Sequence, residues 1–170
     1  MNPLVVFVGP PGAGKTTVGR LVAARSDVEF RDTDHDVERM AGSSISDIFV
    51  ERGEAAFREL EREAVRAALA EHAGVVALGG GAVVSPDTRE LLAGQRVVFL
   101  DVGLAAAAER VGLNQSRPLL AVNPRAQLQR MLQERRALYE AVATLTVATD
   151  DRTPDEVADL VVAALDARSV

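Results

Sequence analysis

The stretch 9–17, GPPGAGKTT, fits the pattern GxxxxGK followed by Ser or Thr, directly after an apolar run and at the start of a helical pattern. In that context the pattern forms a phosphate-binding loop, whose backbone N–H groups and helix N-terminus favour anions. Lys15 is the only lysine among 19 lysine and arginine residues. We expect it to bridge the terminal phosphates of a nucleotide and Thr16 to offer its hydroxyl to Mg²⁺. The alternative is a chance glycine-rich turn. The expected nucleotide contacts are Gly12, Ala13, Gly14, Lys15, Thr16 and Thr17.

Two carboxylates, Asp32 and Asp34, follow the expected second strand in the run RDTD. Ligands of a doubly wound sheet bind at the carboxyl ends of its strands, and alternate residues of an extended segment point the same way. We expect one carboxylate to organise hydrated Mg²⁺ and the other to accept the proton of an acceptor hydroxyl. A helix N-cap is a competing and compatible role for Asp34. Asp101 also ends an apolar strand and competes with Asp32 for the metal.

Two further features have both a functional and an ordinary structural interpretation. In GEAAFRELE, 53–61, Arg58 and Glu61 lie at i, i+3 on a helix. They form either an ion pair that directs the guanidinium or an ordinary solvated face. The third strand leads into three glycines, 79–81, which either let a ligand approach the backbone N–H groups or form a bare turn.

Short β-branched runs alternate with amphipathic patterns along the chain. This alternation predicts an α/β protein, a three-layer α/β/α sandwich with a five-stranded parallel sheet. Capping hydroxyls are expected at Ser85 and Thr153, each before a proline. The irregular segment of about 112–124 is expected to be a mobile lid. The predicted strands are 4–8, 28–31, 75–78, 97–100 and 145–148, and the predicted helices are 14–25, 34–42, 45–52, 54–72, 86–93, 104–111, 125–141 and 154–167.

The composition limits the possible functions. With 170 residues, 48% of them hydrophobic, the chain suits one domain with a substantial core. The absence of cysteine and the presence of only two histidines exclude a disulfide framework and disfavour zinc, so any metal should be oxygen-bound. A net charge of -6 and 4% aromatic residues disfavour nucleic acid as a partner. No apolar run approaches a membrane span and no targeting signal appears, so we expect a cytoplasmic protein without membrane contact.

These residues together resemble the shikimate kinase family, most closely its actinobacterial forms. The resemblance covers nearly the whole chain and rests on GPPGAGKTT, DTD, GEAAFRELE, LGGGAV, RPLL, ERRALYEAVA and RTP. It implies the P-loop NTP hydrolase fold of the nucleoside monophosphate kinase type. It also implies ATP-dependent phosphorylation of the 3-hydroxyl of shikimate, a step of chorismate and aromatic amino-acid biosynthesis, with Mg²⁺ as cofactor and a monomeric enzyme.

By the same resemblance, Asp34 is the base and binds the ring hydroxyls, and Glu61 orients Arg58. The family usually has a proline two residues before the tyrosine of its RxPxY motif, where this chain has Ala137. The motif points to Arg135 as a substrate ligand, and the adjacent Arg136 competes for the role. The other implied contacts are Arg58, Gly79, Gly80, Gly81 and Arg135 to the substrate, Lys15 and the lid residue Arg117 to the ATP phosphates, Arg110, Arg152 and Pro154 to adenine, and Thr16 and Asp32 to Mg²⁺.

Three other functions share some of these features. A GTP switch needs a second lysine for its NKxD motif, and the chain has none. A kinase for gluconate or for a nucleoside monophosphate shares the phosphate loop but not the combination of GExxFR and GGG. A non-catalytic ATP-dependent binding module explains the loop alone and leaves DTD and the lid arginine without a task.

Overall fold

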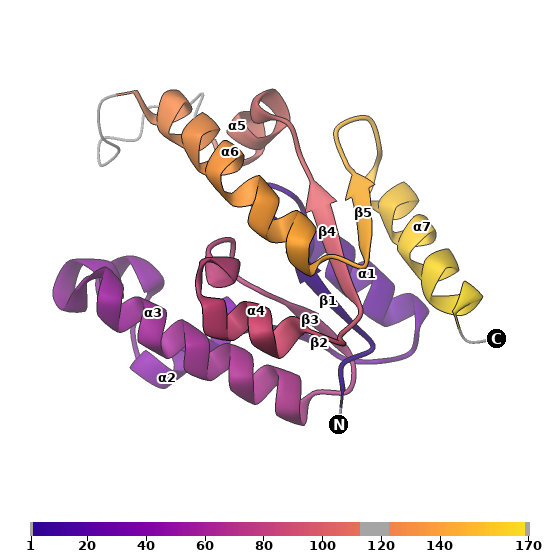
Figure 1. Cartoon of the computed structure of the whole chain (residues 1–170), viewed down its shortest axis with the longest axis horizontal. Coiled ribbons are helices and arrows are strands. Elements are labelled where there is room, and N and C mark those ends of the chain that lie inside the picture. Colours follow the sequence, from indigo (N-terminus) through magenta and orange to yellow (C-terminus); the bar gives the residue numbers. More distant parts are fainter. Residues whose placement is uncertain (1, 113–122, 169–170) are drawn as a thin grey trace.

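The computed structural model describes residues 2–112 and 123–168. In this part of the chain, five parallel strands form a sheet in the order β2-β3-β1-β4-β5, with helices on both faces (Figure 1). The strands are β1 (Val5–Val8), β2 (Phe30–Asp32), β3 (Val75–Ala77), β4 (Val97–Asp101) and β5 (Leu145–Ala148). The helices are α1 (Lys15–Arg25), α2 (Thr33–Ala41), α3 (Ile45–Glu71), α4 (Pro86–Leu92), α5 (Leu104–Arg110), α6 (Pro124–Val142) and α7 (Pro154–Ala167), with a short 3₁₀ helix, η1 (Ala82–Val84).

The central strand β1 is buried on both faces, as an apolar run in a parallel sheet should be. Its side chains alternate between two core clusters, because successive residues of a strand point to opposite faces. Val5 and Phe7 join the cluster that packs against α1 and α7. Val6 and Val8 join the cluster that packs against α3, α4 and α6. The carboxyl end of β1 is therefore held rigidly where the phosphate loop begins.

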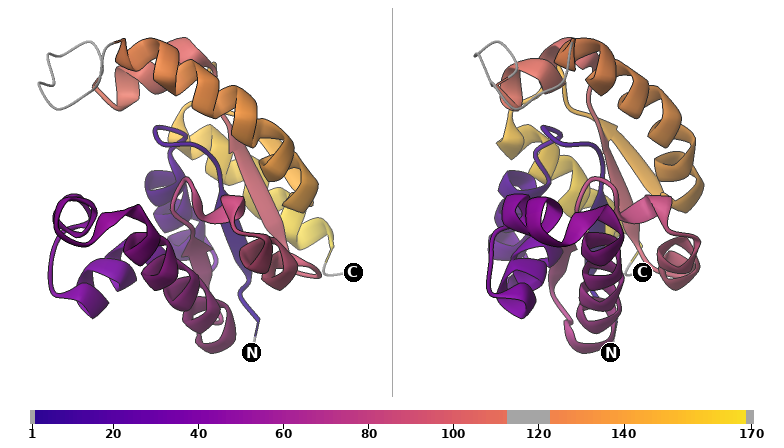
Figure 2. Two further views of the ribbon diagram at one scale, coloured as in Figure 1. Left: turned by 60° about the vertical axis from the view of Figure 1, so that its left-hand side comes forward. Right: turned by 90° about the vertical axis from the view of Figure 1, so that its left-hand side faces the viewer.

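Helix α2 and the first half of α3 form a projection beside the sheet with a small core of its own. Val37, Ile48, Phe57 and Ala64 are its buried apolar residues. Figure 2 shows this projection extending on the same side of the sheet as α5 and the start of α6. The projection carries the end of the RDTD run and Arg58, so it positions the expected acceptor-side residues.

Most of the predicted elements are confirmed to within three residues at each end. The two helices predicted at 45–52 and 54–72 are one element, α3, with a kink at Gly53, whose φ of 84° and ψ of 169° are non-helical. The apolar stripe through Phe57 faces the core as its spacing predicts. The fold is the predicted α/β sandwich.

One of the two capping predictions was wrong, the other was confirmed, and one short element was not predicted. Ser85 occupies the N-cap of α4 but makes no side-chain capping hydrogen bond. Thr153 does cap α7, by accepting from the Glu156 N–H. The three glycines lead into η1, which the sequence pattern did not predict. Gly79, Gly80 and Gly81 all have a φ outside the positive range. The backbone conformation therefore does not explain why these three positions are glycine.

None of the helices in the described ranges has the length and apolar character needed to cross a membrane.

Candidate active site

The phosphate loop connects β1 to α1 through three glycines with positive φ: Gly9 at 153°, Gly12 at 82° and Gly14 at 92°. Such angles strain other residues. A Cβ on Gly9 would also lie 2.7 Å from the Leu100 carbonyl oxygen, so the loop can pack this closely only with glycine. The loop leads directly into the N-terminus of α1, a position at which backbone N–H groups and the helix dipole favour anions.

Lys15 lies across this loop. Its Nζ donates to the carbonyl oxygens of Gly9 at 2.7 Å and Pro10 at 3.0 Å. Desolvation lowers the pKa of Lys15 to about 8, an effect that nearby Asp34 and Asp32 partly offset. A cation held this way is positioned beside any phosphate that enters the loop, and a bound phosphate would favour its charged form.

The pair Asp32 and Asp34 is arranged differently from the prediction. The strand ends at Asp32 and α2 begins at Thr33, so the two carboxylates do not lie on one extended segment. Asp32, rather than Asp34, is the N-cap: its Oδ1 accepts from the Asp34 N–H at 2.9 Å. The expected N-cap role for Asp34 was therefore wrong. Both residues nevertheless line one cavity of about 260 Å³ together with Lys15 and Thr16.

The carboxyl group of Asp34 has an unusual environment for an aspartate. Burial, followed by the charges of Asp32 and Glu61, raises its pKa from 3.8 to about 6, while Lys15 lowers it. A carboxylate with a pKa near 6 can accept a proton near neutral pH and still be a stronger base than an ordinary aspartate. This is the property that a general base in the cavity needs.

Thr16 and Asp32 face each other beside the loop. The Thr16 hydroxyl donates to Asp32 Oδ2 at 3.1 Å. Within the described residues, no group of three or more histidine, cysteine and acidic side chains could hold a metal ion. Mg²⁺ does not require such a cage, because it keeps several waters and binds one or two protein oxygens plus substrate phosphates. The hydroxyl and carboxylate therefore fit Mg²⁺ bound together with a nucleotide.

Arg58 and Glu61 form an ion pair rather than a solvated face. Arg58 Nη1 donates to Glu61 Oε1 at 2.7 Å, and the Glu61 side chain is only 4% exposed. Burial raises the pKa of Glu61, while the hydrogen bond from Arg58 lowers it. The guanidinium also lies over the Phe57 ring, 5.2 Å from its centroid. Arg58 is thus held on two sides.

The glycine run allows these side chains to pack against bare backbone. A Cβ on Gly79 would lie 2.5 Å from Asp34 Oδ1, and a Cβ on Gly81 would lie 2.5 Å from Arg58 Nη1. Gly80 contacts the Pro11 ring in the same way. The Gly79 N–H already donates to the Thr33 hydroxyl at 3.3 Å. The glycines therefore leave room for the protein's own acid and guanidinium, a reason that neither sequence interpretation contained.

The adjacent arginines of α6 have different surroundings. Arg136 donates to both oxygens of Asp101, at 2.8 and 2.7 Å, and contacts Glu140 at 2.9 Å. The sequence predicts Asp101 as a competing metal ligand. Its carboxylate is instead paired with the Arg136 guanidinium. Arg135 is half-buried and makes no ion pair within residues 2–112 and 123–168. Its charge acts on Lys15, Glu61 and Tyr139.

A second cavity, of about 200 Å³, lies on the other side of the phosphate loop. The residues predicted for adenine, Arg110, Arg152 and Pro154, all line it. Arg110 donates to the Gly12 carbonyl at 3.0 Å and to the Thr149 hydroxyl at 3.2 Å, so it connects the loop to the end of β5. Gly14 and Thr17 line both cavities, so one nucleotide can place its base in this cavity and its phosphates in the other.

Sequence reasoning missed three residues of this site. Thr33, between the two aspartates, is fully buried and bonds the Ala77 carbonyl and the Gly79 N–H. Thr149 and Tyr139 are also buried. The Thr149 hydroxyl donates to the Asp101 carbonyl, and the Tyr139 hydroxyl donates to the Gly80 carbonyl. The only available signal was their proximity to the motifs. Arg117 and most of the expected lid, about 112–124, lie outside the described residues.

Comparison with known proteins identifies the family of this chain. The sequence model of the shikimate kinase family matches residues 11–166. A shikimate kinase of Streptomyces coelicolor is 60% identical over 165 residues, which cover 97% of this chain and 95% of that protein. One of Thermobifida fusca is 59% identical over 160 residues, 94% of this chain and 93% of that protein. The structure of shikimate kinase from Acinetobacter baumannii in complex with shikimate is 35% identical, with a TM-score of 0.91, and the match covers 100% of this chain and 96% of that one. The chain belongs to the shikimate kinase family.

Proposed function

We propose that this protein transfers the γ-phosphoryl group of ATP to the 3-hydroxyl of shikimate, giving shikimate 3-phosphate and ADP in aromatic amino-acid biosynthesis. The observation that carries the proposal is the single cavity shared by the loop cation Lys15 and the high-pKa carboxyl of Asp34. A phosphoryl donor and a hydroxyl acceptor must meet between such groups for in-line transfer.

On the acceptor side, Asp34 accepts the proton of the 3-hydroxyl as the oxygen bonds to the γ-phosphorus. The bond from that phosphorus to the β–γ bridging oxygen breaks, and ADP leaves with the electron pair. Arg58 and Arg135 bind the shikimate carboxylate, for which arginine supplies two parallel hydrogen bonds. Gly79, Gly80 and Gly81 form the backbone wall of this site. The structural support is the Arg58–Glu61 pair and the absence of a carboxylate partner for Arg135 in the described ranges.

On the donor side, the loop N–H groups from Gly12 to Thr17 bind the phosphates. Lys15 stabilises the charge that develops on the transferred group. Arg110, Arg152 and Pro154 surround adenine in the cavity that they line. Arg117, beyond the described residues, remains a prediction for the ATP phosphates, and with it the lid of about 112–124. An Arg117→Ala variant that kept full kcat would contradict that prediction.

Thr16 and Asp32 hold Mg²⁺ in this proposal, Thr16 directly and Asp32 through water. The bound ion would neutralise phosphate charge during transfer. Their hydroxyl–carboxylate contact of 3.1 Å supports the assignment. Mn²⁺ can replace Mg²⁺ as a spectroscopic probe, so its binding with ADP can be followed by electron paramagnetic resonance. Asp32→Ala should weaken Mn²⁺ binding with ADP, whereas an unchanged Mn²⁺ affinity would remove Asp32 from the site.

One assay tests the proposed reaction against its alternatives. ADP release is measured with ATP and Mg²⁺ against shikimate, gluconate and nucleoside monophosphates in turn. We expect turnover only with shikimate. Turnover with another acceptor would replace the substrate assignment, and no acceptor-dependent turnover would favour the ATP-dependent binding module.

We also propose that residues 1–170 act as one kinase domain, with an acceptor-binding region at about 32–61, and that the protein is a cytoplasmic monomer. The net charge of -6 keeps nucleic acid an unfavourable partner. Light scattering coupled to size-exclusion chromatography measures the mass directly, and a mass of twice 18.0 kDa would contradict the monomer.

A further inference from the structure

Tyr139 links two elements that carry residues of the proposed carboxylate site, helix α6 and the glycine run 79–81. It lies on α6, one turn after Arg135, and is 1% exposed. Its hydroxyl donates to the carbonyl oxygen of Gly80, in the middle of the glycine run. A residue of the last third of the chain thus fixes a backbone group of the β3–η1 connection.

Arg135 also acts on the same hydroxyl: its charge and its hydrogen bonding lower the pKa of Tyr139, against the larger effect of burial. A tyrosine hydroxyl has one proton to donate and lone pairs to accept, so both contacts can exist together. Burial raises the pKa of Tyr139, which keeps the phenol protonated and able to donate to Gly80. The charges that act on its pKa are those of Arg135, Arg58 and Glu61, all from the same site.

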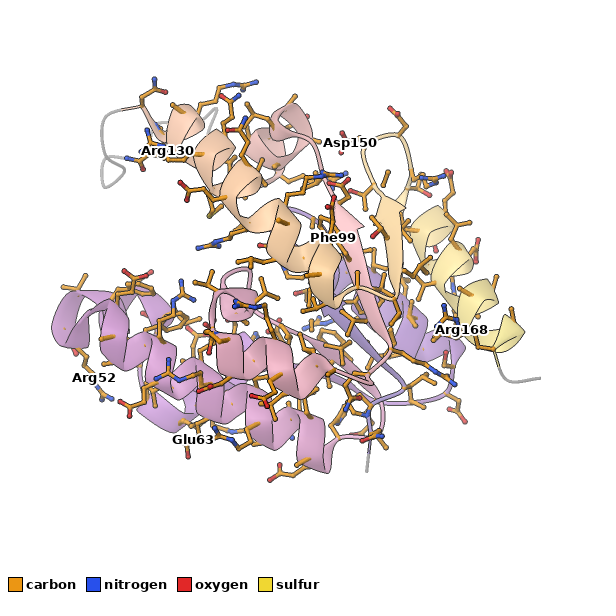
Figure 3. The ribbon with its side chains drawn as sticks, viewed as in Figure 1. Arg52, Glu63, Phe99, Arg130, Asp150 and Arg168 are labelled. Carbon is orange, nitrogen blue, oxygen red and sulfur yellow. The ribbon has the colours of Figure 1, made fainter. Side chains whose placement is uncertain are left out.

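The ring of Tyr139 has a rigid support. It stacks on Phe99 of β4, with centroids 5.0 Å apart and an interplanar angle of 28°. Figure 3 shows Phe99 on β4 beneath α6. Because the ring is packed between the sheet and the backbone of α6, the hydroxyl has little freedom to move. Its hydrogen bond therefore also restricts the position of the Gly80 carbonyl.

We propose that Tyr139 is a positioning residue, which sets the guanidinium of Arg135 and the backbone of Gly80 for the carboxylate-bearing substrate. This inference rests on the proposed function, because it assumes that Arg135 binds the substrate carboxylate. Tyr139 acts through Arg135 and Gly80 and does not itself need to touch the reacting atoms. Side chains at i and i+4 lie on one helix face, so the spacing of Arg135 and Tyr139 makes the contact possible.

Tyr139→Phe tests the hydroxyl alone, because the phenyl ring can keep its stack on Phe99. We expect the KM for shikimate to rise by about fivefold or more, as a lost hydrogen bond to a charged group allows. The KM for ATP and the melting temperature should stay close to those of the wild type. A matched control is Thr144→Val, which removes a hydroxyl that bonds Val97 at the other end of β4, and it should leave both KM values unchanged. An unchanged KM for shikimate in Tyr139→Phe would overturn the proposal.

A double-mutant cycle separates positioning from packing. Shikimate affinity is measured by calorimetry in the wild type, Tyr139→Phe, Arg135→Ala and the double variant. If Tyr139 acts largely through Arg135, Tyr139→Phe should cost much less in the Arg135→Ala background than in the wild type. Fully additive losses would overturn the proposal. Shikimate turnover by the wild type is measured in parallel: its absence would overturn the proposed function, whereas its presence with additive losses would overturn this inference alone.

Discussion

Arg136 and Asp101 are joined by two parallel hydrogen bonds of 2.8 and 2.7 Å. This ion pair connects α6 to the carboxyl end of β4. It engages both the Arg136 guanidinium and the Asp101 carboxylate. The charge of the neighbouring Arg135 acts instead on Lys15, Glu61 and Tyr139, whose pKa values it lowers. Two adjacent arginines that look equivalent in the sequence therefore have different surroundings.

Alanine substitutions of these two arginines should have different effects. Arg135→Ala should raise the KM for shikimate by about tenfold or more, because an arginine–carboxylate contact is lost. Arg136→Ala removes an ion pair whose arginine is 51% exposed, and such pairs contribute only about 0–1 kcal/mol to stability. Steady-state kinetics and thermal melts of both variants distinguish them. A larger rise in KM for Arg136→Ala would reverse the assignment.

Arg58→Ala should weaken shikimate binding by about tenfold or more and leave ATP affinity nearly unchanged, because a charged hydrogen-bond partner is lost. It also leaves Glu61, whose side chain is 4% exposed, without its cation. Arg58→Lys is therefore the control for stability, since it keeps a cation beside Glu61 but not the planar fork. Calorimetric titration with each ligand measures both affinities. Equal losses for ATP and shikimate would mean that Arg58 is misplaced.

The glycine run offers a pair of steric tests. Gly81→Ala should raise the KM for shikimate, because the new Cβ displaces the Arg58 guanidinium, and Gly79→Ala should lower kcat, because it displaces Asp34. Gly94→Ala is the control: its Cβ meets nothing within 4 Å, and its φ of 81° should cost about 1 kcal/mol of stability without a kinetic effect. Wild-type kinetics in both glycine-run variants would contradict the packing argument.

The raised pKa of Asp34 predicts that activity increases with pH in the acidic range. Its pKa of about 6 means that the base is protonated below this value, so kcat/KM should rise with pH through about 6. It should then level off until Lys15 of the free enzyme begins to lose its proton near pH 8. Asp34→Asn should abolish the acidic limb and lower kcat steeply while the fold is retained. The pH profile of kcat/KM is the measurement, and an unaltered kcat in Asp34→Asn would exclude Asp34 as the base.

The same carboxyl should reduce stability at neutral pH. Its pKa is higher in the folded protein than the ordinary aspartate value of 3.8, so between pH 3.8 and about 6 the folded state binds more protons than the unfolded chain. The free energy of unfolding therefore falls as pH rises through this window. Asp34→Asn should raise the stability at pH 7 by up to ~3 kcal/mol, at about 1.4 kcal/mol per pKa unit, and have little effect at pH 3. Urea titrations at both pH values test this.

Lys15→Arg keeps the charge but should lower kcat by about 100-fold or more, the scale of losing one well-placed donor to the transition state. The planar guanidinium does not fit the space in which Nζ reaches the Gly9 and Pro10 carbonyls. Arg66→Lys, an exposed exchange of the same two residue types on α3, is the matched control. Nearly full activity of Lys15→Arg would show that charge alone suffices.

The sequence by itself determined the strands, the helices and the phosphate loop. These depend on local patterns: β-branched runs buried on both faces, apolar stripes at helical spacing, and glycines at positive φ. The motifs also indicated the family and the acceptor-side residues Asp34 and Arg58. Such features need only neighbours within a few positions along the chain.

The tertiary structure alone decided how the site residues are oriented. Neighbouring residues on a helix point about 100° apart, so the choice between Arg135 and Arg136 depends on how α6 packs against β4. The reason for glycine at 81 is Arg58, 23 positions away in the chain, and the partner of Asp101 lies 35 positions away. These contacts exist only once distant segments have packed together, because no local pattern in the sequence encodes which side chain will fill the space beside a given backbone.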